Sequence, residues 1–190
     1  MDREATLARF RRAGALLEGH FKLSSGLHSA GYLQSALVLQ QPADAAVLGA
    51  ALGALAAAWR PHVVLSPALG GLIIGHEVAR ALGVRAIFAE RLDGVLTLRR
   101  GFALAPGERV LVVEDVLTTG RSTKETIDVA VAAGAEVVGA AAIIDRSGGT
   151  VDVGVPFQAL AQVAWPNYDP ATCPLCAQGV PVTRPGSRPT

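Results

Sequence analysis

The sequence predicts a protein of the α/β class, built on a parallel sheet with helices on its faces. From position 62 onward, short apolar runs rich in β-branched residues alternate with segments of helical periodicity. Such short apolar runs are typical of strands buried on both faces, as in a parallel sheet. Strands that alternate with helices favour parallel pairing through right-handed crossovers. The 190 residues suffice for one such domain, so we expect a single domain.

Two helices and a strand pair are expected before this pattern begins. Apolar residues at helical spacing mark the first helix, and alternation of apolar and polar residues marks the strands. Pro42 suits the first position of the second helix, where its missing N–H costs nothing. The expected elements are a helix over 3–17, strands over 20–24 and 32–38 that turn at Ser25 and Gly26, and a helix from Pro42 to about Ala58.

The remaining elements follow the α/β pattern. The expected strands cover 62–66, 84–89, 110–113, 136–144 and 157–163. The expected helices cover 72–82 and 124–133, closed by Gly83 and Gly134. Residues 90–107 show no strong period. The tail from Trp165 is rich in Pro, Cys and polar residues, so we expect irregular structure there, with disorder in the last few residues.

The composition excludes several classes of function. Apolar residues make up 51% of the chain, which indicates a large buried core. A net charge of +1 gives no general attraction to nucleic acid. No apolar run approaches the roughly 20 residues of a membrane span. The charged start, MDREATLARFRRAG, lacks the apolar core of a secretion signal, so we expect a cytoplasmic location and no membrane partner.

The stretch RVLVVEDVLTTGRSTKET, residues 109–126, carries the main candidate site. An apolar strand leads into Glu114 and Asp115, and a glycine-bearing loop with hydroxyl side chains leads into a helix. Loop amides and a helix N-terminus form an anion site, and Gly120 allows the positive φ that such a loop needs. The hydroxyl donors are Thr118, Thr119, Ser122 and Thr123. The carboxylates can accept hydrogen bonds from a sugar diol or face a divalent cation, which together describes a site for a ribose 5-phosphate.

This stretch allows two other interpretations. It could be an ordinary buried strand followed by solvated turn residues. It could also be the acidic strand of an ATP-binding domain, which requires G-x-x-x-x-G-K-[ST] elsewhere. Lys22 and Lys124 are the only lysines, and neither follows such a glycine. The ribose phosphate interpretation is therefore favoured.

Further candidate residues lie at other strand ends and loops. The turn SPALGG, residues 66–71, has glycines whose backbone amides could face a second anion. Residues 90–102 hold Arg91, Arg99 and Arg100, and read either as a mobile lid or as a hairpin that turns at Asp93–Gly94. Arg146 follows a strand at its carboxyl end and could bind a carboxylate in bidentate fashion.

Cys173 and Cys176 form one C-P-L-C pair. A zinc site wants four ligands, and none of the four histidines, at 20, 28, 62 and 76, lies nearby in the sequence. Structural or free thiols, a metal shared across a dimer and a disulfide all remain open.

Five segments together resemble the orotate phosphoribosyltransferases, a branch of the type I phosphoribosyltransferase family. They cover roughly residues 15–150 and are FKLSSGLHSAGYLQ, SPALGG, FAERLDGVLTLRRGF, VLVVEDVLTTGRS and IIDRSGG. The segment around Asp115 is specific for the type I fold, and the N-terminal segment and Arg146 point to orotate. The C-terminal GVPFQAL and CPLCAQGVPVTRPGS resemble one branch of that family.

The resemblance implies a central parallel sheet flanked by helices, with a core over 60–149 and a small hood and tail from residues 1–40 and about 150–190. It implies transfer of a ribosyl 5-phosphate from phosphoribosyl pyrophosphate to orotate, giving orotidine 5′-phosphate in pyrimidine synthesis. It also implies Mg²⁺, bound mainly through the substrate, and a homodimer whose lid loop reaches the neighbouring active site.

The resemblance also assigns residues. Catalytic roles fall to Asp115, Glu114 and Arg91. Phosphoribosyl pyrophosphate would be bound by Glu114, Asp115, Val116, Leu117, Thr118, Thr119, Gly120, Arg121, Ser122, Leu69, Gly70 and Arg91. Orotate would be bound by Thr118, Arg146, Tyr32 and Leu33, the last two lying over the base.

The chain departs from the family pattern in its cations. Many members have Lys where this chain has Ser24, and the usual lid carries Lys and His, whereas this lid has only arginines. Arginine can neutralise developing charge on pyrophosphate but is a poor proton donor. Two alternatives stay open: a phosphoribosyltransferase for a purine or uracil, and a non-enzymatic regulator with the same ligand fold.

Overall fold

The computed structural model describes residues 1–23 and 25–184, and its architecture is the expected α/β arrangement. A six-stranded sheet has the order β5-β4-β3-β6-β7-β8, with every neighbouring pair parallel except β4 and β5. Its strands are β3 (Val63–Pro67), β4 (Arg85–Leu92), β5 (Val95–Leu98), β6 (Arg109–Leu117), β7 (Glu136–Asp145) and β8 (Phe157–Gln162). The central parallel sheet that the sequence predicts is confirmed.

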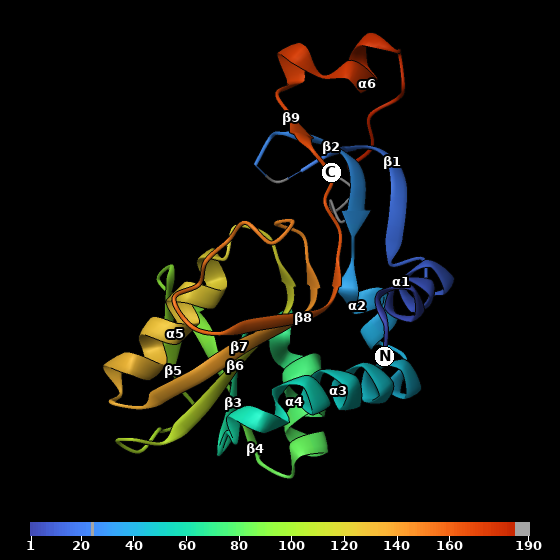
Figure 1. Cartoon of the computed structure of the whole chain (residues 1–190). Coiled ribbons are helices and arrows are strands. Elements are labelled where there is room, and N and C mark those ends of the chain that lie inside the picture. Colours follow the sequence, from blue (N-terminus) through green and yellow to red (C-terminus); the bar gives the residue numbers. More distant parts are fainter. Residues whose placement is uncertain (24, 185–190) are drawn as a thin grey trace.

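Helices cover both faces of this sheet. The helices are α1 (Arg3–Arg12), α2 (Ser35–Leu39), α3 (Pro42–Ala56), α4 (Gly71–Leu82) and α5 (Arg121–Ala132), with a 3₁₀ turn, η1, at Ala57–Trp59. Figure 1 shows α5 on one face and α3 and α4 on the other. Two hydrophobic clusters match this division: one joins α1–α4 to the sheet, and the other joins α5 to the opposite face.

A smaller antiparallel sheet, β1-β2-β9, forms the hood that the resemblance implies. Its strands are β1 (Leu16–Lys22), β2 (His28–Leu33) and β9 (Asn167–Tyr168). The C-terminal segment continues through η2 (Pro170–Thr172) and α6 (Pro174–Ala177). In Figure 1 this sheet and α6 lie above the larger sheet, so N-terminal and C-terminal segments of the chain come together there.

Several expected elements differ in extent. The first helix ends at Arg12, because Gly14 takes a positive φ of 64° and the chain then enters β1. The strand expected over 32–38 is wrong in its second half, since Ser35–Leu39 forms α2. The tail is more ordered than expected, because β9 pairs with β2. The expected disorder of the last residues, and the Ser24 substitution, lie outside the described residues.

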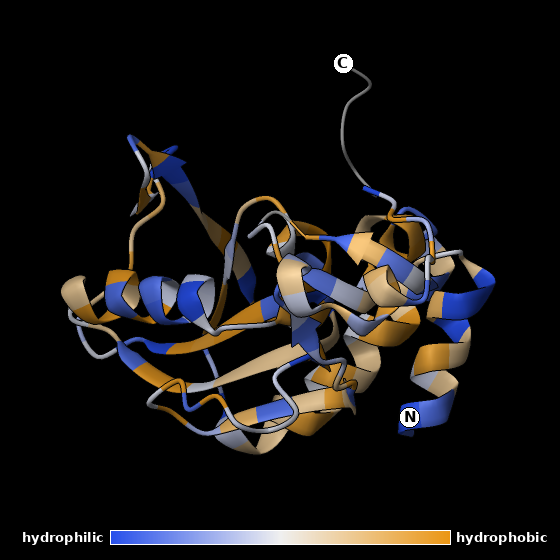
Figure 2. Cartoon of the chain, turned by 90° about the horizontal axis from the view of Figure 1, so that it is seen from above, coloured by the Kyte–Doolittle hydropathy of each residue, from blue (hydrophilic) through white to orange (hydrophobic). Residues whose placement is uncertain are grey.

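The helices separate apolar from polar surface. In Figure 2, the helix that begins at the N label, α1, carries bands of hydrophobic and hydrophilic residues. Leu7 and Phe10 of α1 are buried, whereas Arg11 and Arg12 are exposed. Segment 42–59 has the length and mean hydropathy, 1.4, of a helix that could cross a membrane, a criterion that core helices also meet. Here Leu48 and Leu52 of α3 pack into the core.

Candidate active site

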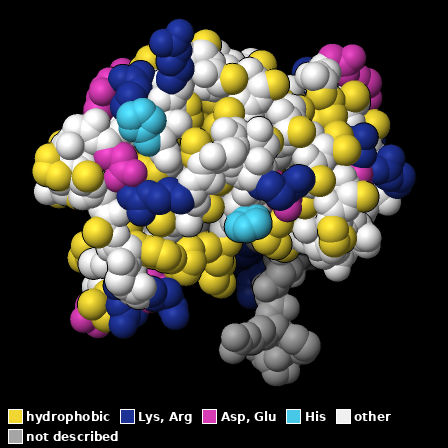
Figure 3. Space-filling model, turned by 90° about the horizontal axis from the view of Figure 1, so that it is seen from below, with side chains coloured by type: hydrophobic (Ala, Val, Ile, Leu, Met, Phe, Trp, Pro, Cys, Tyr) yellow, Lys and Arg dark blue, Asp and Glu magenta, His cyan; other side chains and the backbone are white. Residues whose placement is uncertain are grey.

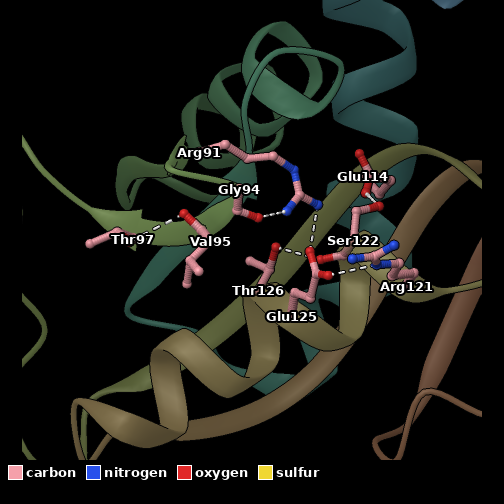
Figure 4. A network of polar contacts seen from close by, with 9 residues as sticks. All are labelled: Arg91, Gly94, Val95, Thr97, Glu114, Arg121, Ser122, Glu125 and Thr126. Carbon is pink, nitrogen blue, oxygen red and sulfur yellow. Dashed lines mark hydrogen bonds and ion pairs between the residues drawn. The ribbon is translucent and has the colours of Figure 1, made fainter.

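The two carboxylates of β6 have different neighbours. The strand runs four residues further than expected, to Leu117, and so includes Glu114 and Asp115. Glu114 faces α5, where the Ser122 Oγ donates a hydrogen bond of 2.6 Å to its Oε2 (Figure 4). Asp115 faces the turn after β3, with its Oδ1 2.7 Å from where a Cβ on Gly70 would lie. The two acids thus contact different elements, α5 and the turn after β3.

Glu114 is unusual because its carboxyl group is buried. Only 5% of the residue is exposed. Burial is the main cause that raises the pKa of Glu114 to about 8; the hydrogen bond from Ser122 opposes this, and the nearby charge of Asp115 adds to it. Near neutral pH Glu114 is therefore largely protonated in the free chain, and it can both donate and accept a hydrogen bond. Asp115 is half-buried and open to a ligand.

The loop after β6 has the geometry of an anion site. Thr118 and Thr119 are exposed, and α5 begins at Arg121, three residues earlier than expected. Gly120 precedes it with φ of 72°, and a Cβ there would lie 2.6 Å from the Cγ1 of Val151. Glycine is thus required both for conformation and for space. The first amides of α5 lack partners within the helix, so they are available to a phosphate.

Three residues in or next to this loop are buried or half-buried. Leu117 is buried, and its carbonyl accepts the backbone N–H of Arg146 at 2.8 Å, so its side chain does not face the loop. Val116 packs partly against the core. Thr123 is also buried, whereas Thr118 and Thr119 are exposed, and the Thr123 Oγ1 has no hydrogen-bond partner among the described residues.

The glycine turn after β3 lies against the same crevice. Its Ala68–Leu69 peptide is cis, and Leu69 is 82% exposed. A Cβ on Gly71 would lie 2.9 Å from both the Ser66 Cβ and the Val113 carbonyl oxygen. The small residues therefore let this turn approach β6 closely and place Leu69 and Gly70 beside Asp115. The proposed pyrophosphate turn and the acidic pair are brought together, as the sequence predicts.

The arginine-rich segment is a hairpin. Strands β4 and β5 pair around Asp93 and Gly94, whose φ angles of 51° and 86° fit a two-residue turn. Arg91 donates to the Gly94 carbonyl at 2.6 Å and also to Glu125 on α5 (Figure 4). The same Glu125 accepts a hydrogen bond of 2.8 Å from Arg121. The hairpin thus reaches the first turns of α5, next to the anion loop.

The other two arginines of the hairpin point elsewhere. Arg99 and Arg100 both pair with Glu90, at 2.8 Å each. These pairs lower the pKa of Glu90, chiefly through the hydrogen bond from Arg100. Of these three arginines, Arg91 is the one held beside α5.

Arg146 lies at the carboxyl end of β7, on the same side as the anion loop. Its guanidinium is half-buried, donates to the Asn167 Oδ1 at 3.0 Å and lies 6.0 Å from the ring centre of Trp165. Asp145 fixes the next turn by accepting bonds from the backbone of Ser147 and Gly149, at 2.8 and 3.0 Å. Burial lowers the pKa of Arg146, which nevertheless stays charged at neutral pH.

Trp165 and Asn167 are site residues that the sequence analysis missed. A Cβ on Gly31 would lie 2.3 Å from the Trp165 ring, so the hood packs directly onto this aromatic. The available signal was position: Trp165 follows the last parallel strand at the edge where ligands bind. It was overlooked because the tail was expected to be irregular.

Tyr32 and Leu33 lie in β2 on opposite faces. Leu33 packs against the same hydrophobic cluster as Trp165. The Tyr32 ring instead packs against Phe21, with ring centres 6.0 Å apart. Among the described residues, the structure thus brings Leu33, but not Tyr32, toward the Trp165 side.

Comparison with known proteins agrees with this geometry. The family model described as "Phosphoribosyl transferase domain" matches residues 37–160. The orotate phosphoribosyltransferase of Pelotomaculum thermopropionicum is 52% identical over 188 residues, covering 99% of each chain. That of Thermotoga maritima is 52% identical over 177 residues, covering 93% of this chain and 95% of its own.

Solved structures give the same result. The orotate phosphoribosyltransferase of Aeropyrum pernix is 28% identical with a TM-score of 0.65, over 81% of this chain and 91% of its own. That of Mycobacterium tuberculosis, solved with inorganic phosphate, is 25% identical with a TM-score of 0.68, over 85% and 95%. The chain therefore belongs to the type I phosphoribosyltransferases and, within them, to the orotate phosphoribosyltransferase family.

Proposed function

We infer that the chain transfers the 5-phosphoribosyl group of phosphoribosyl pyrophosphate to orotate, giving orotidine 5′-phosphate and pyrophosphate. The observation that carries this is the meeting of three features at one sheet edge. These are the acidic pair with its anion loop, the glycine turn beside Asp115, and the half-buried Arg146. The first two suit a ribose 5-phosphate that bears pyrophosphate, and the third suits an anionic base. Full-length relatives of about half identity carry the name of this activity.

The proposed chemistry follows from charge. Breaking the anomeric C–O bond leaves a cation-like ribose and a more negative pyrophosphate. Asp115 and Glu114 would hold the ribose hydroxyls beneath that developing cation. Arg91, now bound to Glu125, would turn to the leaving group. Orotate is already an anion and needs little activation, so the protein mainly aligns the reactants.

We propose Mg²⁺ as the cofactor, bound mainly through the substrate. The donor set fits this, because Asp115 offers half-buried carboxylate oxygens beside the glycine turn, and Mg²⁺ prefers oxygen ligands and keeps several waters. When bound, Mg²⁺ supplies charge neutralisation to the pyrophosphate. The protein's own part would be to orient the ribose hydroxyls against Asp115.

We also propose a homodimer whose hairpin reaches the neighbouring active site. Apolar side chains that a single chain leaves exposed support this. Val47 and Leu55 of α3 are 40% and 39% exposed, and Ile73 of α4 is 44% exposed. Figure 3, which views the molecule from below, shows hydrophobic side chains reaching the surface between charged ones. Burial of such groups between two copies would remove them from water.

Replacement of Arg146 by Ala tests the base assignment. Because the guanidinium would bind the orotate carboxylate, its loss should raise the KM for orotate by about 100-fold, as expected for a buried charged hydrogen-bonded pair. The KM for phosphoribosyl pyrophosphate should change by less than about threefold. The measurement is the loss of orotate absorbance with phosphoribosyl pyrophosphate and Mg²⁺.

Arg121→Ala serves as a matched control, since Arg121 is exposed at the anion loop. It should affect phosphoribosyl pyrophosphate more than orotate. Equal effects of Arg146→Ala on both substrates would refute the assignment to orotate. A folded dimer with no turnover at all would favour a non-enzymatic regulator instead.

A further inference from the structure

Two histidines and two cysteines converge in the hood, away from the catalytic crevice. His20 lies in β1, His28 begins β2, Cys173 precedes α6 and Cys176 lies within it. Their ligand atoms all lie within 4.8 Å of one another. The sequence analysis found no histidine near the cysteine pair, because His20 and Cys173 are 153 positions apart. The fold closes that distance through the pairing of β2 with β9.

The atoms that meet are those a metal would use. The His28 Nδ1 lies 2.8 Å from the His20 Nε2 and 3.3 Å from the Cys176 Sγ. The His20 Nε2 lies 3.6 Å from the Cys173 Sγ and 3.8 Å from the Cys176 Sγ. Tetrahedral zinc, with bonds of about 2.3 Å to sulfur and about 2.0 Å to nitrogen, places such ligands roughly 3.3–3.8 Å apart. Of these four distances, the one between the two imidazole nitrogens lies below that range, by about 0.5 Å.

A second layer of contacts prepares His20 for this role. The His20 Nδ1 lies 2.7 Å from the carbonyl oxygen of Val180, which can only accept, so Nδ1 carries the proton. In a neutral ring the Nε2 then presents its lone pair to the cluster. Thr183 fixes the same strand, because its backbone N–H and its Oγ1 both donate to the His20 carbonyl, at 2.8 and 3.1 Å.

Burial and redox state also suit a metal. His20, His28 and Cys173 are buried, at 2%, 6% and 3% exposure, and Cys176 is the exposed member. Both thiols are free, although they lie in one C-P-L-C pair. Cysteine thiolate and imidazole are the ligands that zinc prefers. Four protein ligands leave no open position, which is the arrangement of a structural site.

We propose that His20, His28, Cys173 and Cys176 form a structural Zn²⁺ site that fastens the C-terminal tail to the β1–β2 hairpin. Metal bound there joins segments that are far apart in the sequence, so it stabilises the hood without touching the reacting atoms. The hood in turn packs on Trp165 through Gly31. Zinc thus supports the wall of the orotate side indirectly.

The first experiment measures metal content in the full chain purified without chelators, by plasma mass spectrometry. We expect about one zinc per chain, falling to less than about a tenth in Cys176→Ser and in His28→Ala. His62→Ala is the matched control, because His62 is exposed and lies directly before β3, outside the cluster. This variant should keep the full zinc content. Circular dichroism checks that each variant is folded.

The second experiment uses the wild-type chain, so its result does not depend on whether the variants fold. Zinc is removed from the wild-type chain under reducing conditions, and Co²⁺ is added. We expect the visible bands of tetrahedral Co²⁺ with a thiolate charge-transfer band, and a fall in Tm of roughly 5 °C or more on metal removal that zinc reverses.

Three results would overturn the proposal. The first is a chain with reduced thiols that holds no zinc and gives no thiolate band with Co²⁺. The second is a Cys173–Cys176 disulfide in the freshly purified chain. The third is an equal loss of zinc in His62→Ala, which would indicate non-specific binding to surface histidines.

Discussion

At the scale of single residues, two adjacent acids of β6 have different physical roles. Glu114 is enclosed beneath α5 and bonded by Ser122, whereas Asp115 is half-buried beside Gly70. The sequence alone does not distinguish the roles of these two acids. The difference arises from their surroundings, because Glu114 lies against α5 and Asp115 lies against the turn after β3. One acid therefore has a raised pKa while its neighbour lies open to a ligand.

The raised pKa of Glu114 predicts how stability depends on pH. Its value of about 8 in the folded chain exceeds that of an unfolded glutamate, so the folded state holds a proton that the unfolded state releases. The free energy of unfolding should therefore fall as pH rises from about 5 to 8. Glu114→Gln should remove this slope and, without ligand, raise stability at pH 8 by about 1 kcal/mol or more. Urea unfolding at several pH values measures this.

Glu108→Gln provides the comparison, because the pKa of Glu108 is shifted in the opposite direction. Its hydrogen bond from Arg85 lowers the pKa of Glu108, so its stabilisation is present at neutral pH and is lost only in acid. That variant should keep the wild-type slope between pH 6 and 8. If Glu114→Gln also retains the wild-type slope, the burial of Glu114 is not the cause of that slope.

How much could be predicted at this scale depended on distance along the chain. Gly70, Thr118 and Arg146 were found because strand ends in a parallel sheet share an edge. Trp165 obeys the same rule but was hidden by the expectation of an irregular tail. His20 and Cys173 could not be linked, since no local pattern reports a pairing across 153 positions.

At the scale of elements, the loop from β6 into α5 depends on one glycine. Gly120→Ala places a Cβ against Val151 and a non-glycine residue at φ of 72°. We expect a loss of about 2–4 kcal/mol in stability, from conformation and clash together. The KM for phosphoribosyl pyrophosphate should rise at least about tenfold, because the anion loop shifts. Urea unfolding and steady-state kinetics measure the two effects.

Gly107→Ala separates the effect of the positive φ from the effect of the steric clash. Gly107 has a nearly identical φ of 73°, yet a Cβ there meets nothing within 4 Å. It should lose only about 1–2 kcal/mol and leave both KM values unchanged. Similar KM changes in the two variants would contradict a local role for Gly120.

Elements were predicted where their signal is local. The Asp93–Gly94 turn follows from residues that accept positive φ, and Gly83 ends α4 at φ of 69° as expected. Alternation over 32–38 was misread, because five residues cannot distinguish a short helix such as α2 from a strand. The sequence predicts β6 too short, because the expected strand ends before the first charged residue. Charged residues can continue a strand where the edge of the sheet opens toward a ligand.

At the scale of the whole molecule, the active site is assembled from distant parts. In the site that we propose, the larger sheet supplies the anion loop and Arg146, and the hairpin supplies Arg91. The hood combines N-terminal and C-terminal segments (Figure 1), and its Gly31 packs against Trp165. In the homodimer that we propose, the hairpin of one copy serves the site of the other.

Subunit mixing tests the proposed sharing of the hairpin. Arg91→Ala and Asp115→Asn should each reduce kcat at least about 100-fold, since each removes a charge needed at the transition state. If the hairpin serves the neighbouring site, a hybrid dimer has one site with Asp115 and the partner's intact hairpin. Refolding the two variants together in equal amounts makes half of the dimers hybrid, so about a quarter of wild-type activity should return.

If instead each hairpin serves its own chain, every site in the hybrid lacks either Arg91 or Asp115, and no activity returns. Light scattering on the mixture establishes that dimers are present, so a monomer would contradict the dimer itself. Mixing two samples of the same variant is the control and should restore nothing. Return of activity therefore requires a site made of both chains, because no rearrangement within one chain can supply the missing side chain.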